Sequence, residues 1–210
     1  MRDLLDEITA AHRDVHRRGS GDAEEIAAVV RRRYDAAVPD VWDAVTDPER
    51  LRRWFAPVTG DLRVGGAFQV EGNAGGEVRQ CDPPHALTVT WGGPESVLRV
   101  RLSPDGDTAT VLEIEHSVPV AFAGSGAGAL YVGPGWDVAV LGLGLHLRGE
   151  AVGDPVAWEG TPEVRRFTLA SIDAWVDAVG ATADPDEVAS ALDAARAQFA
   201  PEPAGQHPEG

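Results

Sequence analysis

The sequence predicts an α+β fold in which a curved antiparallel β-sheet wraps around a long C-terminal helix, with extra N- and C-terminal helices. Three observations support this prediction. A strand and two short helices are expected between residues 31 and 55, a series of short alternating runs follows between 65 and 116, and an apolar helix is expected over 136–150. Turn residues recur about every ten positions within that series, with no helix between them, which is typical of an antiparallel sheet.

The first 17 residues have the spacing of an amphipathic helix. Its apolar stripe is formed by Leu4, Ile8, Ala11 and Val15. His12 and His16 are four residues apart, which could place two metal ligands on one helical face, but no third ligand is evident nearby. We therefore expect solvated histidines, no metal site, and an N-terminal helical extension over residues 1–28.

The segment 31–55 is predicted to open the main domain. Residues 33–38 alternate polar and apolar side chains, as a half-buried strand does. Pro39 fits the first turn of a helix, because the N–H that proline lacks would be unpaired there. Asp47 can cap a second short helix and Pro48 can occupy its first position. Two short helices this close together are expected to form a V-shaped pair that packs against a larger surface of the protein.

The runs between residues 65 and 116 alternate apolar and polar side chains, which is the pattern of half-buried strands. The residues on their more apolar faces are Phe68, Val70, Leu87, Val89, Trp91, Leu98, Val100, Leu102, Leu112, Ile114 and His116. Glu113 and Glu115 alternate with the last of these, so we expect both carboxylates to face solvent.

The predicted helix over 136–150 is apolar on more than one side. One face is formed by Trp136, Val140, Leu143 and Leu147, and another by Val138 and Leu145. Asp137 and Arg148 mark a narrow polar edge, so the helix should be covered on more than one side. Gly142 and Gly144 each weaken a helix by about 1 kcal/mol relative to alanine. Either close packing or a space beneath the helix would explain them.

Helices predicted near the end of the chain are candidates to pack over that apolar helix. Thr161 and Asp184, each followed by proline, are predicted to begin two further helices, and Gly180 to end the first of them. We assign residues 153–200 to a C-terminal helical extension. Residues 201–210, rich in proline, glycine and glutamate, are expected to be disordered.

Composition and charge exclude several function classes. The net charge of −16 argues against nucleic acid as a partner and against anionic membranes. All 18 basic residues are arginine, which excludes Schiff-base chemistry and lysine-dependent phosphate sites. Cys81, the single cysteine, excludes an internal disulfide. We expect no membrane insertion and, because the charged N-terminus does not fit a signal peptide, a cytoplasmic location.

Six segments, in this order, carry a resemblance to a known family. They are VPDVWDAVTDPERLRRWF (38–55), GGAF (65–68), GNAGGEV (72–78), CDPPHALTVTW (81–91), SPDGDTATVLEIEH (103–116) and GPGWDVAVLGLGLHL (133–147). They resemble bacterial members of the SRPBCC superfamily, which includes START and birch-pollen-allergen-like domains. Within it, they are most similar to the branch named after the activator of heat-shock protein 90 ATPase. The resemblance implies a helix-grip fold, which we assign to residues 29–152.

The same resemblance implies a hydrophobic cavity between sheet and long helix, able to hold a lipid-, polyketide- or aromatic-like molecule. The candidate ligand-binding residues are Trp54, Phe55, Phe68, Val70, Trp91, Val100, Leu112, Ile114, His116, Trp136, Val140 and Leu143. No catalytic group stands out. His116 is the best candidate for a general base, although a hydrogen-bonded histidine near a strand end would look the same. No cofactor and no metal are expected.

Three functions are compatible with this sequence. Binding of an apolar small molecule needs only the cavity, and we favour it. A cyclase- or hydrolase-type enzyme, as found in the superfamily, would place a polar group such as His116 beside the cavity with a perturbed pKa. A chaperone-cofactor-like interaction module would expose an apolar patch larger than a few hundred Å². A homodimer or a chaperone partner remains open.

Overall fold

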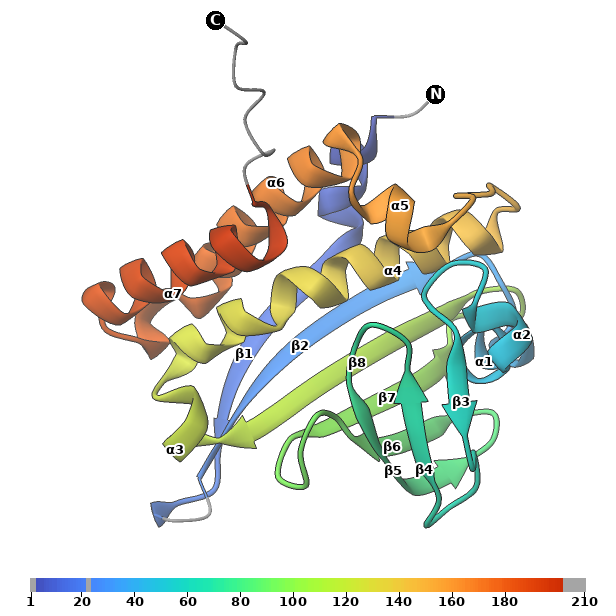
Figure 1. The fold of residues 1–210 in the computed structure, drawn as a ribbon, viewed down its shortest axis with the longest axis horizontal. Coiled ribbons are helices and arrows are strands. Elements are labelled where there is room, and N and C mark those ends of the chain that lie inside the picture. Colours follow the sequence, from blue (N-terminus) through green and yellow to red (C-terminus); the bar gives the residue numbers. More distant parts are fainter. Residues whose placement is uncertain (1–2, 22–23, 202–210) are drawn as a thin grey trace, which may run out of the picture.

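The computed structural model describes residues 3–21 and 24–201, and it consists of a curved sheet with its helices gathered on the concave side (Figure 1). The sheet has eight strands in the order β1-β2-β8-β7-β6-β5-β4-β3, and every neighbouring pair is antiparallel. The strands are β1 (Ala11–Arg18), β2 (Glu25–Tyr34), β3 (Val58–Gly60), β4 (Ala67–Val70), β5 (Gly75–Asp82), β6 (Ala86–Thr90), β7 (Val97–Pro104) and β8 (Thr110–Pro119). The predicted fold class is confirmed.

Two short helices close one end of the sheet, as the proline and aspartate positions predicted. Helix α1 spans Val38–Thr46 with its proline in the first turn, and α2 spans Pro48–Leu51. The Asp47 carboxylate accepts a hydrogen bond from the Glu49 backbone N–H at 2.8 Å, which caps α2.

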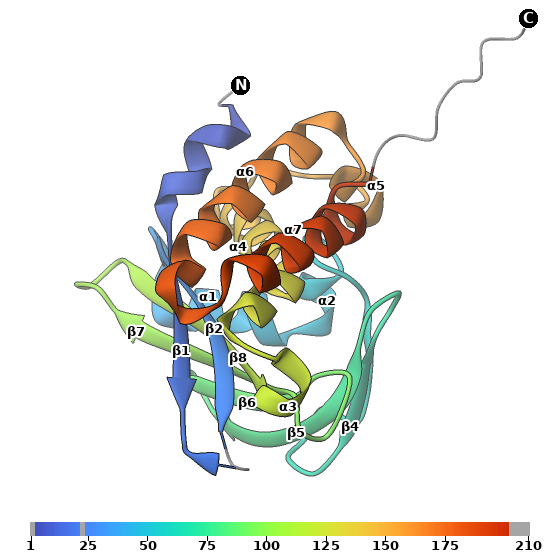
Figure 2. The same cartoon turned by 90° about the vertical axis from the view of Figure 1, so that its left-hand side faces the viewer.

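The long helix α4 (Gly133–Leu147) crosses the concave face of the sheet and is covered on both sides (Figure 2). Its Val140 and Leu143 belong to the main core with the sheet. Its opposite face packs against α6 (Pro162–Val179), where Val138 and Leu141 meet Phe167. The helix begins three residues before the predicted start, because Pro134 fits its first turn.

The C-terminal helices form a second layer over α4. They are α5 (Pro155–Glu159), α6, the 3₁₀ turn η4 (Gly180–Thr182) and α7 (Pro185–Phe199). Thr161 and Asp184 cap α6 and α7 as predicted. Two further short helices, α3 (Val120–Ala123) and η3 (Gly126–Tyr131), join the sheet to α4. In the described part of the chain, no helix is both long and apolar enough to span a bilayer. Residues 202–210, predicted to be disordered, lie outside the described residues.

The prediction of a helix over the first 17 residues is wrong. Leu4–Ala10 forms a 3₁₀ helix, η1, and the chain then becomes strand β1, which pairs with β2 along its whole length. Ala11 and Val15 are four residues apart. Residues at this spacing lie on the same face of a strand and on nearly the same face of a helix, so the apolar pattern fits both. The pairing partner decides between the two. His12 and His16 therefore lie on a strand, and the first strand of the predicted domain begins at Glu25 instead of Arg33.

An ion pair ties this N-terminal segment to the core. The Glu7 carboxylate contacts the guanidinium of buried Arg32 on β2 and also accepts from Arg148 Nη2 at 3.1 Å. The Arg32 guanidinium lies 5.5 Å from the centre of the Tyr34 ring, whose hydroxyl donates to the Val140 carbonyl of α4 at 2.8 Å. The segment that precedes the predicted domain is thus packed into it.

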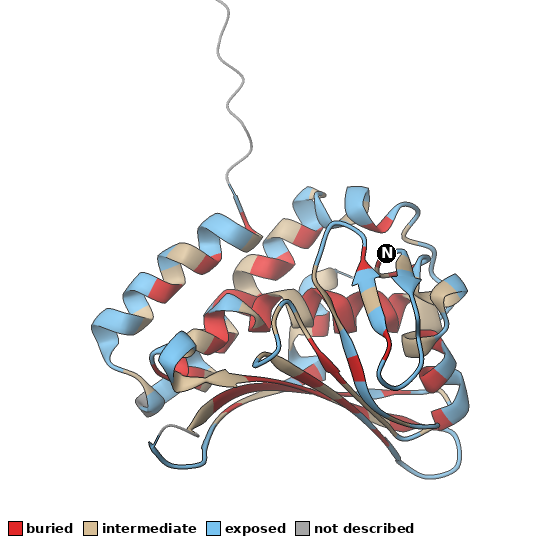
Figure 3. Cartoon of the chain, turned by 60° about the horizontal axis from the view of Figure 1, so that its bottom comes forward, coloured by how far each residue is buried: buried red, intermediate tan, exposed pale blue. Residues whose placement is uncertain are grey.

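The outer face of the sheet carries paired charges. Figure 3 shows that buried residues concentrate on the sheet and on α4, while the outer helices present exposed faces. Glu113 pairs with Arg31 at 2.6 Å and with Arg101 at 2.7 Å. Glu115, expected to face solvent, is buried, because Arg18 of β1 and Arg99 cover it at 2.6 and 3.1 Å.

A buried carboxylate joins three layers of the structure. Asp137 on α4 is fully buried, although the helical pattern placed it on a polar edge. Its Oδ2 accepts hydrogen bonds from Arg13 Nε of β1 at 2.6 Å, and from Ser171 Oγ and Trp175 Nε1 of α6 at 2.5 and 3.0 Å. Burial raises the pKa of Asp137, and these three donors oppose that shift while they link β1, α4 and α6.

We expect Asp137→Ala to lower the free energy of unfolding by about 3–5 kcal/mol, because it leaves the Arg13 guanidinium buried without its partner. Urea denaturation measures this loss. Asp173→Ala on the exposed side of α6 is the matched control, since its only ion pair among the described residues is a 3.8 Å contact with Arg196. That variant should stay within about 0.5 kcal/mol of the wild type. Equal effects of the two variants would contradict a structural role for Asp137.

Candidate functional site

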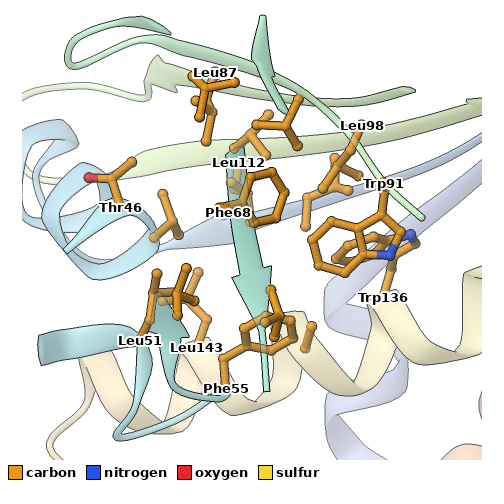
Figure 4. Close-up of a pocket in the computed structure, with 18 of the residues that line it drawn as sticks. Thr46, Leu51, Phe55, Phe68, Leu87, Trp91, Leu98, Leu112, Trp136 and Leu143 are labelled. Atoms are coloured by element: carbon orange, nitrogen blue, oxygen red, sulfur yellow. The ribbon is translucent and has the colours of Figure 1, made fainter. Parts of the chain in front are cut away.

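A cavity of about 170 Å³, here called the inner cavity, lies between the concave face of the sheet, the α1–α2 pair and helix α4 (Figure 4). Its wall is almost entirely apolar. The strands supply side chains from β3 to β8, and α4 supplies Trp136, Ala139, Val140 and Leu143. Leu51 and Phe55 close the side nearest to α2.

The strand register places the wall residues in rows. Leu87 on β6 is opposite Val100 on β7, which is opposite Ile114 on β8. Val89 is opposite Leu98 in another row. Since side chains two apart share a face of a strand, alternation alone directs these residues to the concave side.

Aromatic side chains form a continuous line along one side of the inner cavity. Ring centres are 5.5 Å apart for Trp54 and Phe55, 6.5 Å for Phe55 and Trp91, 6.1 Å for Phe68 and Trp91, and 5.2 Å for Trp91 and Trp136. All pairs are tilted, which is a favourable geometry for aromatic contacts. This wall offers ring faces and edges to a bound apolar molecule.

Eleven of the twelve predicted ligand-binding residues lie on the wall of the inner cavity; His116 does not. Their binding role stays a prediction. The residues not predicted are Val45, Thr46, Leu51, Val58, Leu62, Val78, Cys81, Leu87, Val89, Leu98 and Ala139. Leu87, Val89 and Leu98 carried the same alternation signal as Trp91 and Val100. Thr46 gave no such signal, because a polar residue is not expected on an apolar wall.

His116 lies behind Trp136 and holds it in place. The imidazole is 4% exposed, and its Nδ1 accepts a hydrogen bond from the Trp136 indole N–H at 3.1 Å. Nδ1 is therefore unprotonated, so Nε2–H donates to Ser96 Oγ at 2.7 Å. Burial lowers the pKa of His116 to about 4. With both nitrogens engaged, the imidazole is neutral near pH 7 and fixes the indole that borders the cavity.

The two glycines of α4 are sites of close packing. A Cβ at Gly142 would lie 3.0 Å from the Trp54 carbonyl oxygen, and one at Gly144 would lie 3.0 Å from Arg32 Nη2. Of the two explanations that the sequence left open, close approach applies to both. The inner cavity owes its space to the curvature of the sheet and the line of aromatic rings instead.

The inner cavity carries few polar groups. Among the described residues that line it, none is a carboxylate, a histidine or an arginine. Thr46 Oγ1 donates to the Trp42 carbonyl at 2.7 Å, and burial raises the pKa of the Cys81 thiol, which disfavours the nucleophilic thiolate. Within the described ranges, no three histidine, cysteine, aspartate or glutamate side chains come together as metal ligands would.

Comparison with known proteins agrees with this architecture. The family model of the activator of Hsp90 ATPase homolog 1-like proteins matches residues 35–143. CalU16 from Micromonospora echinospora is 39% identical, with a TM-score of 0.68 over 82% of this chain and 99% of its own. DynU16, described as a protein of the dynemicin biosynthetic locus, is 26% identical, with a TM-score of 0.54 over 63% of this chain and 49% of its own.

A protein of unknown function from Enterococcus faecalis, EF2215, shares the fold alone. It is 14% identical, with a TM-score of 0.59 over 83% of this chain and 95% of its own. No protein with a curated description matches the chain.

The state of His116 predicts a pH dependence of stability. Its folded pKa of about 4 lies below the ordinary value of 6.5, so the unfolded chain binds the proton more tightly. The native state should therefore lose up to roughly 3 kcal/mol from this group as the pH falls from about 6.5 to about 4. Above that range the contribution is fully present.

Urea denaturation of the wild type and of His116→Gln across this pH range measures the effect. Glutamine can still accept the Trp136 N–H but does not titrate, so its profile should be flatter by that amount. His12→Gln, at an exposed histidine, is the control and should follow the wild type. Parallel profiles for wild type and His116→Gln would show that the imidazole is not held neutral.

Proposed function

Because the chain belongs to the family of activator of Hsp90 ATPase homolog 1-like proteins, we propose that it binds an apolar, ring-containing small molecule in the inner cavity. The observation that carries this proposal is the wall itself. It combines aliphatic residues from the sheet with a line of aromatic rings from Trp54 to Trp136. Concave apolar sites of this kind are the usual binding sites of small molecules.

The size of the inner cavity supports a ligand of one or two rings. A volume of about 170 Å³ is well above that of a packing defect. An apolar cavity of about 150 Å³ stays free of water and binds benzene. Transfer of a ring from water to such a wall is favourable by about 25 cal/mol per Å² of buried apolar surface.

The scarcity of ionisable groups on the wall favours binding over catalysis. Proton transfer would need an acid or base within hydrogen-bond distance of the ligand, and among the described residues lining the inner cavity the one ionisable side chain is Cys81, whose thiol pKa is raised by burial. DynU16 is described as a protein of the dynemicin biosynthetic locus. That description supports an intermediate or product of a biosynthetic pathway as the ligand.

The proposal predicts that 1-ethylnaphthalene binds to the purified full chain and that filling the inner cavity prevents it. Val100→Phe should weaken binding at least about tenfold, since the added ring occupies part of the inner cavity that Val100 lines. Titration followed by the fluorescence of the wall tryptophans measures the dissociation constant. Val156→Phe, at a valine that is 70% exposed, is the matched control and should bind as the wild type does.

Overpacking costs about 1–3 kcal/mol, so circular dichroism must first show that Val100→Phe is folded. Leu87→Phe, at a partly exposed wall position, is the second variant if it is not. Failure of the wild type to bind, or unchanged binding in the folded cavity variants, would refute the proposal. Native mass spectrometry of protein purified from its own host would then identify the ligand class directly.

A further inference from the structure

A second pocket, here called the outer pocket, lies on the other side of Trp136 from the inner cavity. Its volume is about 470 Å³. Phe55, Trp91, Trp136 and Ala139 line both spaces, so the two are adjacent. The far wall of the outer pocket comes from the C-terminal helices, through Thr168 of α6 and Phe199 of α7 among others, and these lie beyond the family match.

Specific contacts hold this far wall in place. The ring of Phe199 packs against the start of α4, where a Cβ on Gly135 would lie 3.1 Å from it. Arg165 of α6 donates to the carbonyls of Ala200 and Pro201 at 3.2 and 3.0 Å, which fixes the chain just after α7. The outer pocket is therefore bounded by packed and hydrogen-bonded elements.

The outer pocket differs from the inner cavity in polarity and charge. Its wall includes the buried Thr168 hydroxyl, the side chains of Asn73 and Gln198, and the carboxylate of Glu159 at the rim. None of its described lining residues is an arginine, and Glu159 has no ion-pair partner within the described ranges. Although this residue is exposed, the surrounding wall shields it partly from water and raises the pKa of its carboxyl.

We propose that the outer pocket holds a cationic amine carried by the same ligand whose ring fills the inner cavity, with Glu159 as the partner of the ammonium group. This inference rests on the proposed function, because it assigns the second half of that ligand. It names the ligand class as an apolar ring system joined through a short linker to an amine.

Three observations support an amine in preference to a carboxylate. Glu159 is the only carboxylate among the lining residues that the structure describes, and His116 there is neutral. The net charge of −16 attracts cations and repels anions. Trp91 and Trp136 line both spaces, and indole faces attract an ammonium group at distances up to about 6 Å.

The sizes of the two spaces allow a two-part ligand. The outer pocket alone and the two spaces together both fall within the range of about 300–1,000 Å³ that is typical of small-molecule sites, whereas the inner cavity alone is smaller. A short linker passing Ala139 and Trp136, which line both spaces, would join the halves.

The test compares three naphthalenes that differ only in the tail: 1-ethylnaphthalene, 1-(2-aminoethyl)naphthalene and 1-naphthylacetic acid. Binding to the full chain is measured by tryptophan fluorescence at pH 7 and low salt. We expect the amine to bind at least about fivefold more tightly than the ethyl compound and the acid to bind more weakly than either. In Glu159→Gln, the ratio of the ethyl to the amine dissociation constant should fall toward one, and the indole rings account for any preference that is left.

Glu163→Gln, at an exposed glutamate four residues further along the chain, is the matched control, and the ratio should keep its wild-type value there. An amine that binds no more tightly than the ethyl compound, or a ratio that Glu159→Gln leaves unchanged, overturns this inference. In that case binding of the ethyl compound still supports the proposed function. If none of the three compounds binds, the proposed function fails and this inference fails with it.

Discussion

Helix α4 is apolar around most of its circumference, and covering both of its sides is the constraint that shapes the whole structure. The concave sheet covers one side, and α6 with η1 covers the other. Asp137 is fully buried at the junction of these layers, so its carboxylate needs hydrogen-bond donors from both sides of α4. Arg13 of β1 and Trp175 of α6 are two of these donors. The terminal segments, which lie outside the family match, are therefore structural parts of the fold.

The inner cavity follows from the same arrangement. A helix with bulky side chains cannot follow the whole concavity of a curved sheet, and aromatic rings occupy part of the remaining volume without filling it. Trp136 is the key ring, because it faces both the inner cavity and the outer pocket. His116 and Ser96 fix its indole through neutral hydrogen bonds. The histidine that looked like a candidate base thus acts by positioning a wall residue.

Several features of the site could be read from the sequence because they depend on local periodicity. Alternation along β7 and β8 placed Val100, Leu112 and Ile114 on the face that becomes the wall. The same reasoning failed for His116, which shares that face but lies beyond the cavity edge, since alternation gives the direction of a side chain and not its position along the cavity. It also failed for Glu115, which points outward as expected yet is covered by arginines from neighbouring strands.

Local patterns were enough to predict the α+β class, the two capped helices after β2 and the apolar helix α4, because caps, turns and periodicity act over a few residues. Features that depend on distant partners became known only from the three-dimensional arrangement. Residues 11–18 become a strand because β2 lies beside them, although their apolar spacing also suits a helix. Gly142 and Gly144 are close-packing sites because Trp54 and Arg32 approach α4. The outer pocket exists only where the C-terminal helices meet α4. Its geometry depends on contacts between segments far apart in the chain, which no local pattern encodes.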